Sequence, residues 1–325
     1  MRIQRRHLLR LAGLGAAVAV TRRLATAQAW PTRPIRWIVG FPPGGSTDVV
    51  VRIMGAYLSE RLGQPVVVEN RPGAATNLAV QAVTSAPPDG HTLLLALVTN
   101  AINATLYETL PFNFLADLAP VGGFVELPLV LVVNPSLPAQ TVTEFVAFAK
   151  AHPDRISLAS FGTGTVSHLA GELFKTTTGA RTVHVPYRGG APLMTDLLAG
   201  QVQAGIDALP NVLPHVQSGA VRALGILSNA RSAALPEVPT IGETVPGYEV
   251  STWSGIVVPM GTPDNVIDRL NRELNAGLAD AAVTRRFAEL GAVPIPSSPA
   301  AFGALFTRET QKWAKVIRSS GIRPE

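Results

Sequence analysis

The alternation of short apolar runs with helical segments constrains the fold of this chain most. Three apolar runs have the composition of β-strands: Ile35–Phe41, Pro65–Asn70 and His91–Val98. Helices are predicted between them at Asp48–Leu62, which is amphipathic and precedes a glycine, and at Thr76–Ala86. Strands that alternate with helices in this way are typical of a parallel sheet covered by helices, so we expect the α/β class.

The alternation breaks once and then resumes, which predicts a second lobe. Pro128 separates two extended runs and would interrupt a single strand, so we expect the chain to cross between lobes there. The elements expected around and beyond this point are strands at Pro120–Val125, Leu129–Val133, Arg155–Ser160, Thr182–Pro186, Gln203–Ala208 and Arg222–Ser228, and helices at Val142–Ala151, Val166–Thr178, Pro192–Ala199 and Val212–Ser218.

A proline-rich linker, Leu235–Tyr248, leads into a strand at Val250–Val258 that we expect to cross back. The last elements expected are helices at Asp264–Asp280, Ala282–Leu290 and Pro299–Arg318 and a short strand at Val293–Ile295. The predicted lobes are therefore residues 30–127 with 250–325, and residues 128–249. Two α/β lobes joined by several crossings are typical of a protein whose halves close about a hinge.

The turn after the first strand is a candidate anion site. Gly44 and Gly45 allow a tight turn, and Ser46, Thr47 and Asp48 are all good residues to cap the helix that follows. Bare backbone N–H groups at a helix N-terminus bind carboxylate or phosphate. The motifs of P-loop and dinucleotide-binding proteins are absent, so the turn either holds a small anion or is only structural.

The first 29 residues predict an export signal. Arg5 and Arg6 precede a weakly apolar run, and small residues offer cleavage after Ala27 or Ala29. The arginine pair favours the twin-arginine route, with the general secretory route as the alternative. The apolar run is shorter than the ~20 residues of a membrane span, so we expect no membrane insertion once the signal is removed.

Most of the positive charge belongs to that signal. The full chain has a formal net charge of +5, and the first 29 residues hold six arginines without a lysine or acidic residue. Removing those six charges from +5 leaves a net charge of −1. Because a nucleic-acid-binding protein needs a basic patch in its folded part, we exclude nucleic acid and anionic membrane surfaces as partners. The absence of cysteine excludes disulfides and thiolate sites.

Catalytic and metal-binding motifs are also missing. The histidines are scattered at positions 91, 152, 168, 184 and 215, and no Gly-x-Ser-x-Gly motif occurs. Ser167 and His168 are adjacent on a predicted helix and do not face each other. We therefore expect no catalytic residue, no metal and no cofactor. The alternative is a secreted α/β enzyme acting on an anionic substrate, with Asp207 or His168 as its general base.

A series of segments in a fixed order spans nearly the whole chain beyond residue 29: Phe41–Asp48, Glu69–Ala74, Pro88–Leu93, Ala101–Asn103, Leu106–Tyr107, Leu118–Val121, Gly162–Leu169, Val185–Gly189, Trp253–Gly255 and Pro259–Pro263. In these segments the chain resembles the Bug-type extracytoplasmic solute receptors of tripartite tricarboxylate transporters. The resemblance implies a periplasmic-binding-protein-like (Venus flytrap) fold, with a cleft between two doubly wound lobes. It also implies a periplasmic monomer, a small organic carboxylate as ligand and a membrane permease as partner. A sensor subunit that presents its ligand to a signalling receptor is the alternative.

The resemblance places the ligand carboxylate on the first turn and opposes it with the loop that follows Arg155–Ser160. The ligand-binding residues expected in lobe 1 are Phe41, Pro43, Gly44, Gly45, Ser46, Thr47, Asp48, Thr99 and Asn100. Those expected in lobe 2 are Ser160, Gly162, Thr163, Gly164, Thr165, His168, Arg188 and Asp207.

Several of these side chains have a second interpretation. His168 either contacts the ligand or, as we favour, braces the loop. Asp207 either accepts a hydrogen bond from a ligand amine or hydroxyl or holds a neighbouring loop. Arg188 either binds a second carboxylate or is solvated, and Trp253 either walls the cleft or packs. Relatives are rich in serine where Leu97–Asn100 stands, and cations are scarce, so we expect a mono- or aromatic carboxylate rather than citrate.

Overall fold

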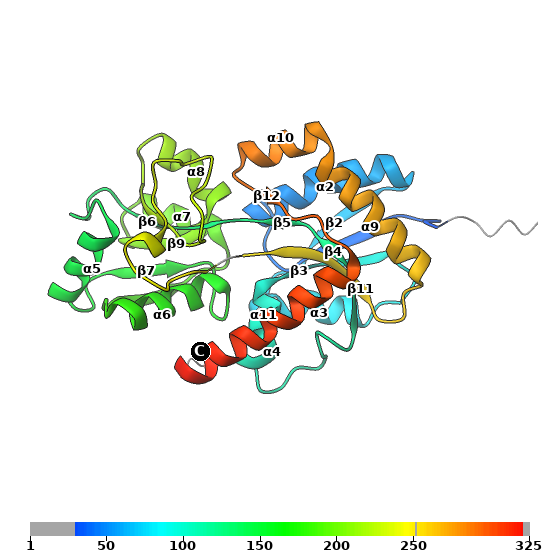
Figure 1. Cartoon of the computed structure of the whole chain (residues 1–325), viewed down its shortest axis with the longest axis horizontal. Coiled ribbons are helices and arrows are strands. Elements are labelled where there is room, and N and C mark those ends of the chain that lie inside the picture. The colour runs from blue at the N-terminus through cyan, green and yellow to red at the C-terminus, as the bar shows by residue number, and fades with distance from the viewer. Residues whose placement is uncertain (1–29, 251, 321–325) are drawn as a thin grey trace, which may run out of the picture.

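Two five-stranded sheets, each with its own helices, form the two halves of the computed structural model (Figure 1). The structure describes residues 30–250 and 252–320, so the predicted export signal lies outside it. We call the half built on the sheet β2-β1-β3-β11-β4 lobe 1, and the half built on the sheet β10-β6-β9-β7-β8 lobe 2. Within the described residues, no helix combines the length and apolar character needed to cross a membrane.

The sheet of lobe 1 is mixed rather than wholly parallel. Strands β1 (Ile35–Val39), β2 (Val66–Asn70) and β3 (Thr92–Leu97) pair in parallel, as the β-α-β-α-β order predicts. Strand β11 (Ser254–Pro259) runs antiparallel to both β3 and β4 (Leu118–Gly123). The parallel pairing predicted for the first three strands is confirmed, and the sheet becomes mixed because β11, in the segment that returns from lobe 2, inserts between β3 and β4.

Six α-helices and one 3₁₀ helix belong to the described part of lobe 1: α2 (Ser46–Leu62), η1 (Ala74–Thr76), α3 (Asn77–Thr84), α4 (Val98–Leu106), α9 (Asp264–Ala279), α10 (Ala281–Glu289) and α11 (Pro299–Ser320). Helix α4 and the 3₁₀ helix η1 were not predicted. The others begin and end within a few residues of their predicted bounds.

Lobe 2 keeps the predicted alternation of strands and helices. Its strands are β6 (Leu129–Val133), β7 (Ser157–Ser160), β8 (Val183–Pro186), β9 (Ala204–Ala208) and β10 (Arg222–Ile226). Strand β7 pairs in parallel with β8 and β9, whereas β6 is antiparallel to β9 and β10. Its helices are α5 (Val142–Ala151), α6 (Val166–Thr178), α7 (Gly190–Leu198), α8 (Leu209–Gln217) and the 3₁₀ turn η2 (Ile241–Glu243).

The two segments that cross between the lobes are held together by hydroxyl groups. Thr252 Oγ1 accepts from the N–H of Leu127 at 3.0 Å and donates to its carbonyl at 2.5 Å. Ser254 Oγ makes the same pair of contacts with Val125, at 3.3 and 2.6 Å. Strand β5 (Val125–Glu126) also pairs with β12 (Val293–Pro294). These two segments form the waist between the lobes in Figure 1, and their hydrogen bonds join them to each other, so they are not two independent linkers.

Aromatic side chains fill the core of each lobe. In lobe 1, Phe124 lies between Trp37 and Phe287, with ring centroids 5.5 and 5.7 Å away. In lobe 2, Phe145 and Phe174 pack together at 5.9 Å. Rings at 4.5–7 Å in tilted or edge-to-face arrangements add to the stability gained from burying apolar area. Each lobe thus has its own group of packed aromatic side chains.

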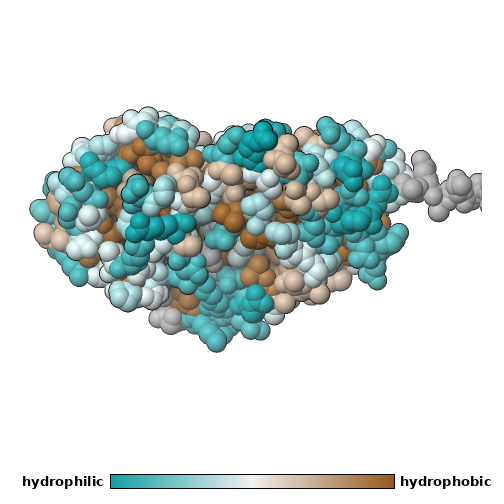
Figure 2. Space-filling model, turned by 45° about the horizontal axis from the view of Figure 1, so that its top comes forward, coloured by the Kyte–Doolittle hydropathy of each residue, from teal (hydrophilic) through white to brown (hydrophobic). Residues whose placement is uncertain are grey.

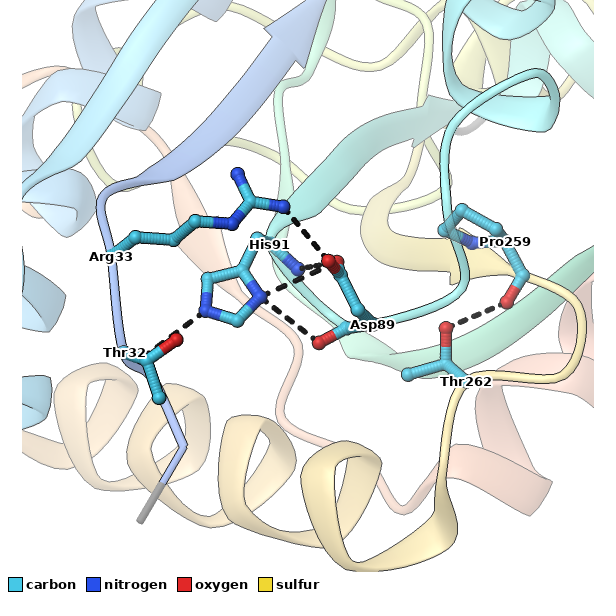
Figure 3. A network of polar contacts seen from close by, with 6 residues as sticks. All are labelled: Thr32, Arg33, Asp89, His91, Pro259 and Thr262. Atoms are coloured by element: carbon cyan, nitrogen blue, oxygen red, sulfur yellow. Dashed lines mark hydrogen bonds and ion pairs between the residues drawn. The ribbon is translucent and has the colours of Figure 1, made fainter. Parts of the chain in front are cut away.

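The Asp89–His91 turn ties the start of strand β3 to the start of strand β1 (Figure 3). Arg33 donates to Asp89 Oδ2 at 2.8 Å, and the backbone N–H of His91 donates to Asp89 Oδ1 at 2.9 Å. The N–H of Thr32 donates to His91 Nε2 at 3.2 Å. This segment, one of those on which the resemblance noted above rests, lies outside the lining of the cavity described below and serves the fold.

Replacing Gly255 tests how closely α11 packs on β11. An added Cβ would lie 2.0 Å from the ring of Phe302, so Gly255→Ala is expected to lower the free energy of unfolding by about 1–3 kcal/mol. Gly55→Ala, in helix α2, is the control, since its Cβ would meet only ordinary contacts from 3.7 Å outward. Urea denaturation measures both variants. A Gly255→Ala protein as stable as the unaltered chain would contradict this packing.

Candidate functional site

A cavity of about 730 Å³, counting the space open to solvent, lies between the lobes. Its lining comes from the first turn, the start of α4, the two crossing segments, the loop after β7, the start of α7 and the end of β9. These residues are Phe41, Pro42, Pro43, Gly45, Ser46, Thr47, Leu97, Val98, Thr99, Val125, Leu127, Leu129, Phe161, Val166, Arg188, Gly189, Gly190, Ala191, Pro192, Asp207, Ala208, Asn211, Thr252, Trp253 and Ser254. The outline of the molecule is notched between its two halves (Figure 2).

Helix α2 begins without a side-chain cap. Gly45 occupies the N-cap position in an extended conformation, and the prediction that Ser46, Thr47 or Asp48 caps the helix is wrong. Gly44 adopts φ +85°, which glycine tolerates and other residues rarely do. The glycine pair turns the chain so tightly that the three polar residues fall inside the first helical turn. The first backbone N–H groups of α2 are left without intrahelical partners.

Asp48 braces this turn from behind. Its Oδ2 accepts from the N–H of Gly44 at 3.0 Å and from Arg52 at 2.9 Å, and its Oδ1 accepts from Asn70 at 3.0 Å. Asn70 also donates to the carbonyl of Phe41 at 3.0 Å. Burial raises the pKa of Asp48, but these hydrogen bonds and the Arg52 charge outweigh it, so the pKa lies below its usual value. Both Gly44 and Asp48 lie outside the cavity lining.

Ser46 is the polar group of the turn with an unused hydroxyl. The residue is 5% exposed, it lines the cavity, and its Oγ has no hydrogen-bond partner among the described residues. A buried hydroxyl without a partner costs free energy that a bound ligand oxygen would recover. With the bare N–H groups and the positive end of the α2 dipole beside it, this turn is suited to an anion.

The two ligand-binding candidates at the end of strand β3 have different surroundings. Thr99 lies in the cavity lining, but Asn100 is turned into the protein, where it accepts from the N–H of Leu97 at 2.7 Å and donates to Thr76 at 2.8 Å. These bonds start helix α4 directly at Val98, although no conventional cap residue precedes it. The lack of that signal explains why the helix was not predicted.

The loop after β7 contributes less to the cavity than expected. Only its Phe161 belongs to the lining, while Ser160, Gly162, Thr163, Gly164, Thr165 and His168 lie outside it. The N–H of Gly164 donates to His168 Nδ1 at 3.2 Å, which supports the interpretation that this histidine braces the loop. The ring of His168 also stacks on that of His184 at 4.0 Å. The loop is held from within lobe 2, so its polar groups serve its shape.

The two lobes touch beside the cavity through these loops. The rings of Phe41 and Phe161 meet edge to face with centroids 5.7 Å apart. A Cβ added to Gly164 would lie 3.0 Å from Leu106, and one added to Gly189 would lie 3.4 Å from Pro42. Lobe 1 and lobe 2 are therefore in contact with each other beside the cavity.

Asp207 and Arg188 both line the cavity but have opposite surroundings. Asp207 is 1% exposed; its Oδ1 accepts from the N–H of Ala208 at 2.7 Å, and Asn211 lies 3.2 Å from both carboxylate oxygens. Burial raises its pKa to about 7, against the opposing effect of those hydrogen bonds. Arg188 is exposed, and its guanidinium has no hydrogen bond or ion pair with the described residues. The lining thus contains a buried acid and an unpaired cation.

The crossing segments supply the part of the lining that was not predicted as ligand-binding. They include Val125, Leu127 and Trp253. The predicted change of lobe near Pro128 could have indicated these residues, since segments that join two lobes also form a wall of the cleft between them. Trp253 combines both interpretations given above: it lines the cavity and packs against Phe302, 5.7 Å away. Asn211 and the Gly189–Pro192 segment were also missed. The two consecutive glycines that follow Arg188 were the available signal for the latter.

The raised pKa of Asp207 predicts a pH-dependent stability. Between its unfolded pKa of 3.8 and its folded pKa of about 7, the folded protein keeps a proton that the unfolded chain has lost. The stability present at pH 4 is therefore lost as the pH rises through about 7. Asp207→Asn removes this loss, so at pH 8 it should raise the free energy of unfolding by up to about 4 kcal/mol, with little effect at pH 4.

Urea denaturation of both proteins at pH 4, 5, 6, 7 and 8 measures this difference. The buried environment would be contradicted by a stability difference that does not change with pH. Asp154→Asn, a change at an exposed acid of lobe 2, is the control and should give a small, constant difference.

Comparison with known proteins agrees with this architecture. The family model described as "Tripartite tricarboxylate transporter family receptor" matches residues 50–322. Protein BugT of Bordetella pertussis is 40% identical over 320 residues, which cover 98% of each chain. The solved structure of R. palustris Rpa4515 with adipate is 36% identical with a TM-score of 0.87, over 91% of this chain and 100% of that one. MatC of Rhodopseudomonas palustris with bound malate is 32% identical with a TM-score of 0.83, over 89% and 100%.

The structure of the periplasmic binding protein BugD is also similar, with 33% identity and a TM-score of 0.86 over 91% of this chain and 100% of that one. These matches confirm the predicted periplasmic-binding-protein-like fold and the resemblance to the Bug-type receptors. The chain belongs to the receptor family of the tripartite tricarboxylate transporters.

Proposed function

We propose that this protein is a periplasmic receptor that captures a small carboxylate between its lobes and delivers it to the membrane permease of a tripartite tricarboxylate transporter. The observation that carries this proposal is the unpartnered Ser46 hydroxyl, buried in the cavity lining beside the uncapped start of α2. A carboxylate of the ligand would accept hydrogen bonds from both the Ser46 hydroxyl and the backbone N–H groups. Relatives solved with adipate and malate support a carboxylate as the ligand.

Capture proceeds without chemistry on the ligand in this proposal. The carboxylate docks on the first turn of lobe 1, where backbone dipoles replace its water. Lobe 2 then closes on it through the Phe41–Phe161 contact and the loops beside it. Closure is favoured only by contacts that the ligand makes in the closed form, so an empty receptor and a loaded one present different surfaces to the permease.

The proposal also includes the organisation of the chain. Residues 1–29 are an export signal removed on secretion, residues 30–127 with 250–325 form lobe 1, and residues 128–249 form lobe 2. This division agrees with sheet membership, since β6 to β10 all belong to the second sheet. The secreted protein acts as a monomer, because one chain provides the turn, the opposing loops and the crossing segments of the cavity.

A carboxylate that binds this cavity is expected to raise the melting temperature of the protein comprising residues 30–325. A ligand present at a hundred times its Kd adds about 2.7 kcal/mol to the free energy of unfolding. Differential scanning fluorimetry with adipate, malate, citrate and benzoate derivatives measures the shift, with the corresponding amides as uncharged controls. A panel in which no acid stabilises the protein more than its amide would refute carboxylate capture.

Two serines of helix α2 separate binding from stability. Ser46→Ala should weaken carboxylate binding about tenfold and keep or slightly raise the stability of the empty protein, because it removes a buried hydroxyl that has no partner within the described protein. Ser59→Ala is the matched control: its hydroxyl donates to Gly55 and accepts from Val66, so its loss should lower stability and leave affinity unchanged. Calorimetric titration and urea denaturation measure the two effects. The reverse pattern would place the carboxylate away from this turn.

A further inference from the structure

We propose that the ligand is an aromatic monocarboxylate with a hydrogen-bond donor on its ring, and that Asp207 accepts a hydrogen bond from that donor. This inference rests on the proposed carboxylate capture and names the class of carboxylate. Three features of the cavity carry it: its balance of charge, its apolar walls, and the unused acceptor capacity of a buried carboxyl.

The charges of the lining suit one carboxylate. Among the lining residues, Arg188 is the single cationic side chain and Asp207 the single acidic one. The backbone N–H groups of the first turn and the guanidinium of Arg188 suffice to bind one carboxylate. A second carboxylate would lie in the same small cavity as Asp207, and like charges at close range repel unless a cation stands between them. The hydroxyls of Thr252 and Ser254 are already engaged across the waist.

The walls of the cavity suit an apolar ring. Phe41, Phe161 and Trp253 present aromatic side chains, with aliphatic and proline side chains between them. The edge-to-face contact of Phe41 with Phe161 brings the walls of the two lobes together, and Trp253 is fixed behind by Phe302. Aromatic surfaces bury flat rings favourably, and pockets of this kind use a few polar groups to orient the ligand.

Asp207 has capacity for one more hydrogen bond. Its Oδ1 is engaged by Ala208 at 2.7 Å, whereas Oδ2 has only Asn211 at 3.2 Å, a donor that it shares with Oδ1. A carboxylate oxygen accepts two hydrogen bonds, so Oδ2 is underused in a fully buried position. The bond to Ala208 is carried by Oδ1, so Oδ2 keeps one acceptor position for a ligand beside the donor that it shares with Oδ1.

The chain makes room for this oxygen at the start of helix α7. A Cβ on Gly190 would lie 2.6 Å from Asp207 Oδ2, so a glycine there permits the carboxyl to stand where it does. The neighbouring Gly189 approaches Pro42 of the first turn, at 3.4 Å for its Cβ position. Because Gly189 and Gly190 are consecutive, the first turn and Asp207 approach the same short segment, and both line the same cavity.

Isothermal titration of residues 30–325 with 4-hydroxybenzoate and 4-fluorobenzoate tests the proposal, since fluorine replaces the donor without adding bulk. At pH 8, where Asp207 with its pKa of about 7 is mostly ionised, the hydroxyl form should bind at least tenfold tighter, as expected for a hydrogen bond to a charged group. In Asp207→Asn this preference should fall below about threefold, while Asp154→Asn should keep it. If Asp207→Asn does not fold, as judged by circular dichroism, the comparison of the two acids on the unaltered protein decides.

The outcomes separate this inference from the function on which it rests. Equal affinity for the two benzoates overturns the role of Asp207. Tighter binding of citrate or malate than of 4-hydroxybenzoate overturns the aromatic class and leaves carboxylate capture standing. Binding of no carboxylate at all removes both proposals.

Discussion

The hydrogen bonds that Asp48 makes behind the first turn are the constraint on which the site depends. They consume the N–H of Gly44 and anchor the turn to Asn70 at the end of β2, so the loop keeps its shape without a ligand. A turn fixed in advance does not lose conformational freedom when an anion arrives. Asp48 lies outside the lining and its charge is paired with Arg52, so it holds the turn of the proposed anion site without facing the ligand.

The waist between the lobes provides the second constraint. Thr252 and Ser254 replace part of a regular strand ladder with side-chain hydrogen bonds to Leu127 and Val125. The crossing segments are thus joined to each other and also face the cavity. Movement of one lobe against the other therefore acts on the lining itself. This arrangement gives a physical link between closure and the ligand, since the same residues serve the hinge and the wall.

Local signals predicted helices more reliably than the roles of polar residues. Helices α5 and α6 have the predicted bounds, because Thr141 caps the first and a left-handed glycine ends the second. Helix α4 was missed because Asn100 bonds back to the strand end in place of a preceding cap. Asp48 was expected at the ligand, whereas bracing of the loop was the favoured interpretation of His168; each of these side chains holds a loop through a hydrogen bond to a backbone N–H.

The sequence by itself determined the α/β alternation, the tight glycine turn before the first helix and the region where the chain changes lobe. These depend on composition and on backbone conformations that neighbouring residues impose. Only the tertiary structure decided which polar groups face the cavity, because that depends on partners distant in sequence. Ser46 and Asp48 are two residues apart, yet only Asp48 has side-chain partners, because Arg52 and Asn70 donate to its carboxylate. The Ser46 hydroxyl has no partner among the described residues.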